Sequence, residues 1–533
     1  MHRRFRIAAV ATAALVPVAL AGGFILQERA SRDGARLFDQ VLGLVSERFV
    51  DTVGVGTLYE KAARGLVEEL QDPYSELYTP KQLAEFTQNT GGRYGGLGMQ
   101  IEPVEGRGVS ILKVFPNTPA EQAGIQTGDV IIAIDTVNTR AWTSQQVSDV
   151  LKGEPGTKVN VSFARMGVTQ PIKVEMTRAI IHIPAVPYTL SFDGNIGYIY
   201  VQGFNETAGE EFAEALQQMQ AKHAKGLVID MRGNPGGYLE QALVMSNLFL
   251  QPGQEILSVR GRGVPAQTHV ARGQPMAPDL PLVVLVDGGT ASASEIVAGA
   301  LQDHDRALII GTTSYGKGLV QTLYPLDGGY AVKLTTAKWY TPVGRSIQKE
   351  RKLLPDGRFV EVYPDSLPAD SLKKLRPAYK SDAGRVVYGG GAITPDLAID
   401  PDTISSAEQE LAKVLAPKAQ LVYQVITAFA YEQKGKVAED FTIQPQWSDA
   451  IYQRLQKEGV LVDRKTYDAG HEWIDRELER RIAETSFGQE AWRKRSLRDD
   501  PQLREALDVL RRGGSQKELF ALASAEKATL KQP

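Results

Sequence analysis

The 533-residue sequence contains no cysteine, which excludes disulfide bonds, thiolate metal ligands and a cysteine nucleophile. Histidine is also scarce: the six histidines stand at positions 2, 182, 223, 269, 304 and 471, without the local spacing of a metal site or a catalytic triad. An excess of positive charge is missing too, because 60 lysines and arginines face 63 aspartates and glutamates. We therefore expect no metal, no organic cofactor and no nucleic-acid partner.

Charged residues are missing from most of the first 30 positions. Met1–Arg6 carries three arginines and a histidine, and no further charge follows until Glu28. The uncharged run, residues 7–26, is about 20 residues long, enough to cross the hydrocarbon core of a bilayer. Ala19-Leu-Ala21 also fits the small-residue pattern of a cleavage site. Residues 1–30 are thus either a cleaved signal peptide or a retained inner-membrane anchor, and both predict an exported, periplasmic or extracytoplasmic protein.

The length predicts several domains, because a chain of this size is too long for one hydrophobic core. Residues 31–90 are predicted to be amphipathic helices that pack or make a homo-oligomer contact. Residues 403–533 are predicted to be a charged helical extension without a chemical motif, either core or a surface for oligomerisation or an adaptor protein. The apolar stripes are Leu37, Val41, Leu44, Val45 and Phe49; Leu58, Ala62, Leu66 and Leu70; Leu411, Val414 and Leu415; Ala419, Val422, Val425, Ile426 and Phe429; and Ile474, Leu478 and Ile482.

Residues 181–402 alternate strand-like and helix-like runs, which predicts an α/β core. Strands are expected at 196–201, 226–231, 282–286 and 308–311, and helices at 206–220, 239–250 and 293–303.

Ser292 stands where the apolar strand 281–286 and its glycine-rich turn give way to the helix that begins at Ala293. Free backbone N–H groups and the positive end of the helix dipole lie beside a hydroxyl in this position. Ser292-Ala-Ser-Glu295 also matches a capping box, in which the serine only caps the helix. The pattern therefore allows either a nucleophile or a plain helix cap.

Lys317 is the plausible base for such a serine, since histidine is not suitably placed. It lies in a glycine-bracketed turn after another apolar strand. If residues 319–323 form a strand, period 2 puts Lys317 and Gln321 on one face, so that an amide could orient the amine. Lowering the lysine pKa from about 10.4 to about 7 costs roughly 4–5 kcal/mol, which burial can impose. Serine–lysine pairs are a known variant of the catalytic triad.

Asn234-Pro-Gly-Gly237 follows a buried strand and opens a helix, so its backbone N–H groups are free to stabilise an oxyanion. We expect Gly236 or Gly237 to act together with the amide of Ala293. The alternative is a loop that merely turns the chain. At the end of the same strand, Arg232 is expected to pair with Asp230. At the end of the helix 293–303, Asp303 is expected to pair with Arg306.

Residues 91–180 resemble a PDZ domain. Glycines at 95, 96 and 98 would let backbone N–H groups converge on an anion, and a strand edge would accept an extended peptide; such modules hold a C-terminal carboxylate in this way. The alternative is that the glycines only make a tight turn. The expected strands are 99–102, 109–115, 130–134 and 158–163, the expected helices are 117–124 and 144–151, and the candidate binding residues are Tyr94, Gly95, Gly96, Leu97 and Gly98.

These motifs together resemble the C-terminal processing peptidases, also called tail-specific proteases, over residues 72 to about 400. The motifs are Asp72-Pro-Tyr-Ser75, Tyr94–Gly98, Asp230–Gly237, Thr290–Glu295 and Gly316-Lys-Gly318 with Gln321. The resemblance implies that Ser292 is the nucleophile, that Lys317 is the general base and that Gln321 positions the lysine. It also implies that an arginine near Arg165 contacts the protease body, although an exposed arginine without a role fits equally well.

The sequence therefore predicts a multidomain α+β protein, a PDZ domain joined to an α/β protease core with helical segments at both ends. Its expected activity is that of an exported serine endopeptidase that cleaves proteins near their C-termini. One alternative is a P-loop nucleotide hydrolase, because Gly311–Lys317 matches most of that motif; Gly318 lacks the hydroxyl that would hold Mg²⁺. The other alternative is a catalytically inactive or scaffold-type exported PDZ protein.

Overall fold

The computed structural model describes residues 32–104, 108–165, 167–263, 265–354, 359–362 and 376–529. Its described residues divide into two compact units. One combines the residues up to Lys81 with Gln321–Thr335, and the other holds Gln82–Val320 and the residues from Thr336 onward. The run 7–26, with its predicted signal or anchor, lies outside the described residues. From residue 32 onward, no described helix is both long and apolar enough to span a bilayer.

The first unit contains a helix over residues 32–48, the helix α2 (Val55–Glu68) and the short strand β1 (Glu76–Tyr78). β1 pairs antiparallel with the start of β18 (Ala331–Tyr340), with Glu76 opposite Lys333. The predicted helices are present, whereas β1 was not predicted. Leu37 and Leu44 are 63% and 61% exposed, so none of the described residues covers the stripe of the first helix.

The PDZ segment is an antiparallel sheet in the order β3-β4-β5-β7-β8, with the short β6 on β5. Its core consists of Val, Ile and Leu side chains from alternate strand positions, together with Phe163. Every predicted strand and helix is present within a few residues, and β8 is an addition. The bounds are β3 Met99–Val104, β4 Gly108–Val114, α4 Pro119–Gln122, β5 Val130–Ile134, β6 Val137–Asn138, α5 Ser144–Leu151, β7 Lys158–Ala164 and β8 Ile172–Thr177.

The core sheet has the order β10-β11-β12-β15-β16-β23, and only β10 runs antiparallel to its neighbour. β12 and β15 are buried along their whole length, as strands of a parallel sheet covered on both faces must be. The α/β prediction is confirmed for this sheet. The bounds are β10 Tyr188–Phe192, β11 Ile196–Tyr200, β12 Gly226–Asp230, β15 Leu282–Val286, β16 Leu308–Gly311 and β23 Leu397–Ala398.

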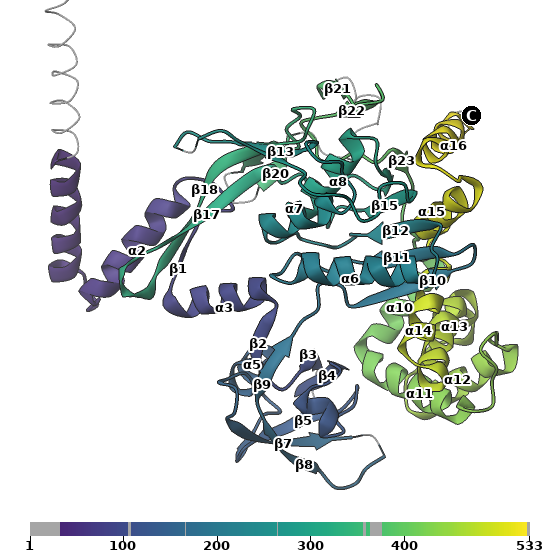
Figure 1. Ribbon diagram of the computed structural model, residues 1–533. Coiled ribbons are helices and arrows are strands. Elements are labelled where there is room, and N and C mark those ends of the chain that lie inside the picture. The colour runs from purple at the N-terminus through teal and green to yellow at the C-terminus, as the bar shows by residue number, and fades with distance from the viewer. Residues whose placement is uncertain are drawn as a thin grey trace, which may run out of the picture. The chain divides into compact units, whose positions relative to one another are not determined.

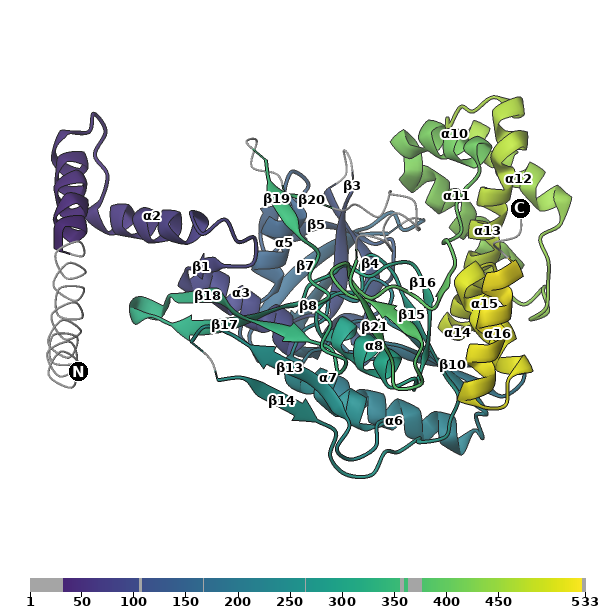
Figure 2. The ribbon, with the colours of Figure 1, turned by 90° about the horizontal axis from the view of Figure 1, so that it is seen from above.

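Different helices cover the two faces of this sheet. α6 (Ala208–Ala221), α7 (Leu239–Asn247) and α8 (Ala293–Asp303) pack on one face. On the other face, side chains of α15 (Pro501–Arg512) and α16 (Gln516–Thr529) pack against β12, β15 and β16. Figure 1 shows the sheet between α6 and α15, and Figure 2 shows α15 and α16 side by side in yellow. The end of the predicted extension is therefore part of the protease core.

A second, antiparallel sheet was not predicted. It joins β18 to β13 (Glu255–Arg260), which pairs in turn with β14 (Gln267–Val270). The strand expected at 319–323 is present as β17 (Leu319–Pro325), which pairs with β18.

The rest of the extension forms a helical bundle with its own apolar core. Leu411 and Leu415 are buried in this core as predicted, whereas Val414 is 40% exposed and does not belong to the stripe. The helices are α10 Ser406–Leu415, α11 Ala419–Gln433, α12 Pro445–Lys457, α13 Arg464–Phe487 and α14 Gln489–Arg498.

Candidate active site

Ser292 occupies a strained position between β15 and α8. Its backbone has φ 54° and ψ −114°, a region that residues other than glycine rarely adopt. Such strain persists only where the surroundings hold it, and it is concentrated at functional sites. Here every residue of α8 is buried, so the helix that follows the serine is fixed along its whole length.

The carboxylate of Glu295 holds the turn that carries Ser292 to the turn that carries Lys317. Glu295 is completely buried. Its Oε2 accepts the N–H of Ser292 at 2.8 Å and the N–H of Lys317 at 2.9 Å. Its Oε1 accepts the N–H of Gly316 at 2.7 Å and the hydroxyl of Ser314. The predicted capping pair of Ser292 and Glu295 is thus present, but the glutamate does more than cap a helix.

Burial raises the pKa of Glu295 above its ordinary value, while bonds from Ser314, Lys317, Gly316 and Ser292 act in the opposite direction. Four donors on one buried carboxyl group fit its ionised, acceptor-only form.

Lys317 has a rigid main chain. Its carbonyl accepts the indole N–H of Trp339 at 3.1 Å, and Gly318 donates to the side chain of Gln348 at 2.9 Å. Gly316 has φ 83°, and a Cβ atom there would lie 2.5 Å from the side chain of Lys349. This close approach requires glycine. The lysine itself is half-buried.

The loop that begins at Asn234 packs directly on the Ser292 turn. Ala291 donates its N–H to the carbonyl of Asn234 at 2.9 Å. A Cβ atom on Gly236, where φ is 90°, would lie 2.8 Å from the amide nitrogen of Ala293 and 2.9 Å from Cβ of Ser292. The predicted oxyanion loop and the predicted nucleophile are therefore in contact.

The two candidate glycines differ in what their amides do. The N–H of Gly236 donates to the side-chain oxygen of Asn234 at 2.9 Å and is already engaged. The N–H of Phe204 donates to the carbonyl of Gly236, and the N–H of Tyr238 donates to the carbonyl of Phe204. In this parallel pairing, the N–H of Gly237 points away from Phe204. Within the described residues, the N–H groups of Gly237 and Ala293 have no acceptor. The geometry favours Gly237 over Gly236.

Asp287 and Thr290 connect the turn that carries Ser292 to the loop after β12 by hydrogen bonds. Oδ1 of Asp287 accepts the N–H groups of Gly233, Gly289 and Thr290 at 2.8, 2.9 and 3.1 Å. The buried hydroxyl of Thr290 donates to the carbonyl of Met231 at 2.8 Å. Sequence reasoning missed Asp287, Thr290 and the side chain of Asn234. Their only signal was position, since Asp287 directly follows a buried strand and Asn234 and Thr290 lie in the turns after such strands.

Gln321 belongs to the first unit, where its amide donates to the hydroxyl of Thr335 at 3.3 Å. The N–H of Thr335 donates to Oγ of Ser75 at 3.1 Å, and that hydroxyl donates to Asp72 at 2.6 Å. Asp72-Pro-Tyr-Ser75 forms the predicted turn. Through Ser75 this motif holds Thr335, the β18 residue that contacts Gln321.

The PDZ glycine motif is shared between a strand and a turn. Tyr94, Gly95 and Gly96 lie in β2 (Arg93–Gly96), which pairs with β9 (Ala179–His182). These three residues therefore lie in a strand and do not form the tight turn that was the alternative for the glycines. Leu97 and Gly98 do form a turn, and their N–H groups have no acceptor within the described residues, while their carbonyls accept the amides of Ala120 and Phe115. The amides of Leu97 and Gly98 are therefore open to a carboxylate.

Arg165 pairs with the buried carboxylate of Asp129 at 2.7 Å and donates to the carbonyl of Gly124 at 2.8 Å. Both partners lie within the PDZ segment, so these contacts stabilise that segment.

At the C-terminal end of α8, the ion pair differs from the predicted one. Asp303 pairs with Arg345 at 2.6 Å, and both side chains are fully buried. Arg306, its expected partner, instead bonds to the carbonyls of Ala277 and Leu280. The expected pair is wrong because Arg306 lies beyond the helix, where the chain has turned away. Arg232 does pair with Asp230 as predicted, at 2.5 Å.

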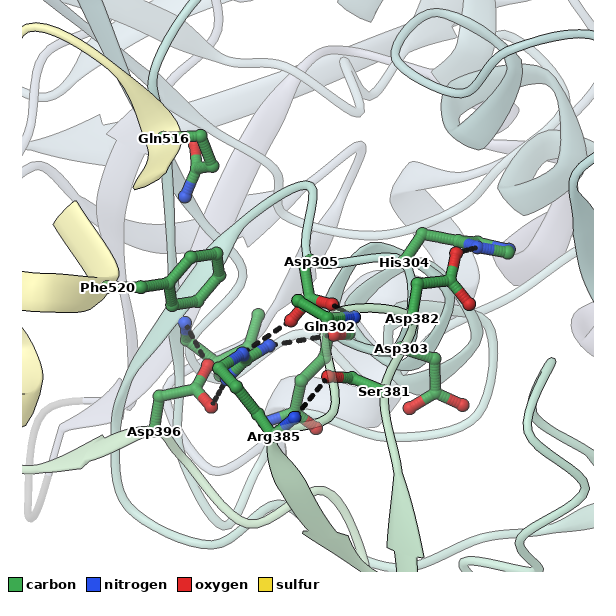
Figure 3. A network of polar contacts seen from close by, with 12 residues as sticks. Gln302, Asp303, His304, Asp305, Ser381, Asp382, Arg385, Asp396, Gln516 and Phe520 are labelled. Atoms are coloured by element: carbon green, nitrogen blue, oxygen red, sulfur yellow. Dashed lines mark hydrogen bonds and ion pairs between the residues drawn. The ribbon is translucent and has the colours of Figure 1, made fainter. Parts of the chain in front are cut away.

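Figure 3 shows a second polar network at the same helix end. Arg385 donates to Asp305 at 2.5 Å, to Asp396 and to the carbonyl of Gln302 at 2.9 Å. Its guanidinium lies 3.9 Å from the ring centroid of Phe520 in α16. The helix that follows Ser292 is thus tied at its far end to α16. No group of three or more metal-binding side chains was found among the described residues.

Comparison with known proteins shows which family this chain resembles. The family model for peptidase family S41 matches residues 195–359, and a PDZ domain model matches residues 111–165. A carboxy-terminal-processing protease of Bartonella bacilliformis is 39% identical over 319 residues, which cover 58% of this chain and 72% of that protein. This chain belongs to the carboxy-terminal processing proteases of peptidase family S41.

Further relatives of this carboxy-terminal processing protease extend the match. The carboxy-terminal processing protease CtpA of Bacillus subtilis is 34% identical over 347 residues, 64% of this chain and 74% of that protein. The solved photosystem II D1 C-terminal processing protease is 29% identical and covers 63% of this chain and 95% of its own, with a TM-score of 0.35. The predicted family, the fold class and the activity of a serine-type peptidase are confirmed.

Proposed function

We propose that this carboxy-terminal processing protease is exported and cleaves proteins near their C-termini with Ser292 as nucleophile and Lys317 as general base. The observation that carries the proposal is the shared oxygen of Glu295, which brings the main chains of the two residues together. The strain at Ser292 and the two amides without acceptors beside it give further support.

The proposed reaction has two stages. Lys317 takes the proton of the Ser292 hydroxyl, and the oxygen attacks the carbonyl carbon of the scissile peptide bond. The N–H groups of Gly237 and Ala293 stabilise the oxyanion, the C–N bond breaks, and the lysine returns its proton to the leaving amine. The lysine then takes a proton from water, whose oxygen attacks the acyl ester. The ester bond to the Ser292 oxygen breaks, and the lysine returns the proton to that oxygen.

The proposed role of the PDZ domain is to capture the substrate tail. The amides of Leu97 and Gly98 would bind the terminal carboxylate, and the edge strand β3 would pair with the tail. Amidation of the last residue of the substrate should therefore raise KM and leave kcat nearly unchanged. An equal KM for the amidated and the free tail would contradict this role.

The ends of the chain have proposed roles as well. Residues 7–26 would direct export and, if uncleaved, anchor the protein to the inner membrane. The exposed stripe that includes Leu37, Val41 and Leu44 would contact a second copy of the chain. The helical bundle of α10–α14 would offer a surface for an adaptor.

The decisive experiment uses an unstructured protein that ends in apolar residues as substrate. Ser292→Ala and Lys317→Ala should each lower the cleavage rate by at least about 10³-fold. Ser191→Ala and Lys338→Ala, which change exposed residues of the same types, serve as matched controls and should cleave like the wild type. Cleavage by Ser292→Ala at the wild-type rate would overturn the proposed nucleophile.

A further inference from the structure

A cavity of about 410 Å³ lies at the carboxyl ends of the core strands, on the face of the sheet that α15 covers. In open α/β sheets this edge is where ligands bind. Ser292 and Asn234 follow strands that end at the same edge. The lining includes Tyr188 from β10, Tyr198 and Tyr200 from β11, Asp230, Asp287 and Thr312.

The three tyrosines give the cavity aromatic walls. The ring of Tyr188 lies 5.3 Å from that of Tyr200 and 6.1 Å from that of Tyr198, at interplanar angles of 25° and 22°. Burial raises the pKa of all three hydroxyls, which keeps the rings neutral at physiological pH. The guanidinium of Arg493 lies 3.7 Å from the ring centroid of Tyr188, so one of these rings already binds a cation.

The charge of the cavity is negative. Arg232 also lines it, but that guanidinium is paired with both Asp230 at 2.5 Å and Asp500 at 2.7 Å. Asp287 adds a carboxylate whose Oδ1 accepts backbone amides, while its Oδ2 has no donor within the described residues. The hydroxyls of Tyr200 and Thr312 likewise have no partner there. An anion would meet an uncompensated carboxylate, whereas a cation would find acceptors and ring faces.

A metal ion fits less well than an organic cation. Among the described residues, no group of three acidic or histidine side chains surrounds a common point. The volume falls within the range of sites for small organic ligands and is larger than a single ion requires. Aromatic walls add attraction for a planar cation such as a guanidinium.

We propose that this cavity is a second binding site, for an organic cation that carries N–H donors, such as the guanidinium end of an arginine side chain. The cation packs against the ring of Tyr200 and donates to Oδ2 of Asp287 and to the hydroxyl oxygen of Thr312. Because Oδ1 of the same Asp287 carboxylate holds the amides of Gly233 and Gly289, the site borders the loops around Ser292 directly.

Calorimetric titration of the full-length protein tests this site. N-acetyl-argininamide stands for a side chain within a polypeptide, agmatine for a free cation, and N-acetyl-citrullinamide is the neutral isostere. The two guanidinium compounds should bind with a Kd below about 1 mM, and the citrulline compound at least about tenfold more weakly. Binding of agmatine alone would assign the site to a free cation, and binding of the arginine amide to a side chain.

Two variants assign the binding to the cavity. Tyr200→Leu removes one ring face, Thr312→Val removes one hydroxyl, and each should weaken guanidinium binding at least about fivefold. Tyr431→Leu changes a tyrosine that is 56% exposed elsewhere and should bind like the wild type. Equal binding of the arginine and citrulline amides, or unchanged binding in both cavity variants, would overturn the site. These titrations do not depend on cleavage, so they fail or succeed independently of the proposed catalytic residues.

Discussion

Ser292 and Lys317 donate their main-chain amides to one and the same atom, Oε2 of Glu295, over 2.8 Å and 2.9 Å. The two amide nitrogens can therefore lie no farther apart than these two bonds placed end to end. Two turns that are distant in the sequence are held against a single buried oxygen. The chemistry proposed for the serine and the lysine rests on this relationship.

Glu295→Gln should lower kcat by about 10²-fold while KM changes little. Glutamine has nearly the same shape as glutamate, but its amide offers one acceptor oxygen in place of two. Some of the four donors to this side chain, which come from Ser292, Ser314, Gly316 and Lys317, therefore lose their acceptor. Bonds to a charged group are each worth about 1.5–3 kcal/mol, and each 1.4 kcal/mol is tenfold in rate. Steady-state cleavage of a tailed substrate measures both constants.

Glu214→Gln is the matched control for this change, since that glutamate is exposed on α6. A KM that rises as much as kcat falls would point to general loss of structure. Wild-type kcat in Glu295→Gln would show that the two turns keep their places without the carboxylate.

Gly236→Ala should abolish cleavage, because its new methyl group would lie 2.6 Å from the carbonyl oxygen of Ala291 and 2.9 Å from Cβ of Ser292. Gly253→Ala is a control with the same φ of 90° and no atom within 4 Å of the added Cβ. Both changes carry the penalty of a left-handed residue, about 1–2 kcal/mol. Only the first also displaces the loop beside the nucleophile. If the two variants cleave equally well, the contact between these loops is not needed.

Local sequence signals predicted the elements that carry the site but not the contacts between them. Residues 282–286, 293–303 and 308–311 have the predicted bounds, because each is a continuous apolar run or helical stripe between glycines or charged residues. The partners of Glu295 and Asp303 could not be predicted, since they come from segments distant in the chain. The second sheet was missed for the same reason, because β13 and β18 gain their order from pairing with each other.

Sequence pattern also cannot assign individual amides. It indicated Gly236 and Gly237 equally, and only the bond from Gly236 to the side chain of Asn234 separates them. Similarly, the sequence left open whether the glycines of Tyr94–Gly98 bind an anion or make a tight turn, and it did not show that the first three residues are held in a strand by β9.

Arg345→Met should destabilise the protease core by about 3–5 kcal/mol, because it leaves the fully buried carboxylate of Asp303 without its charge partner. Urea titration monitored by circular dichroism measures the loss. The double variant with Asp303→Asn should recover part of the stability, since it removes the unpaired charge. Arg464→Met breaks two exposed ion pairs, with Asp449 and Asp468, and should cost far less stability. A loss no larger in Arg345→Met than in this control would contradict the argument.

Lower pH should stabilise the contact between α15 and α16. Oε1 of Glu505 and Oε2 of Glu526 are both buried, and neither has a hydrogen-bond donor among the residues that the structure describes. Burial, followed by the nearby Glu526, raises the pKa of Glu505 from its ordinary value of 4.5 to about 7. Asp508 raises it further, and Arg512, which also pairs with Glu526, acts in the opposite direction. A proton shared by the two carboxylates would supply the missing bond.

The sign follows from proton uptake. Between pH 4.5 and about 7 the folded protein holds a proton on Glu505 that the unfolded chain releases. This contribution to stability is therefore complete below pH 4.5 and is lost as the pH rises through about 7. Thermal scans at about pH 5 and about pH 8 should show a smaller difference in Tm for Glu505→Gln than for the wild type. Glu472→Gln, at an exposed position, should keep the wild-type difference; the same Tm difference in Glu505→Gln as in the wild type would mean that Glu505 and Glu526 do not share a proton.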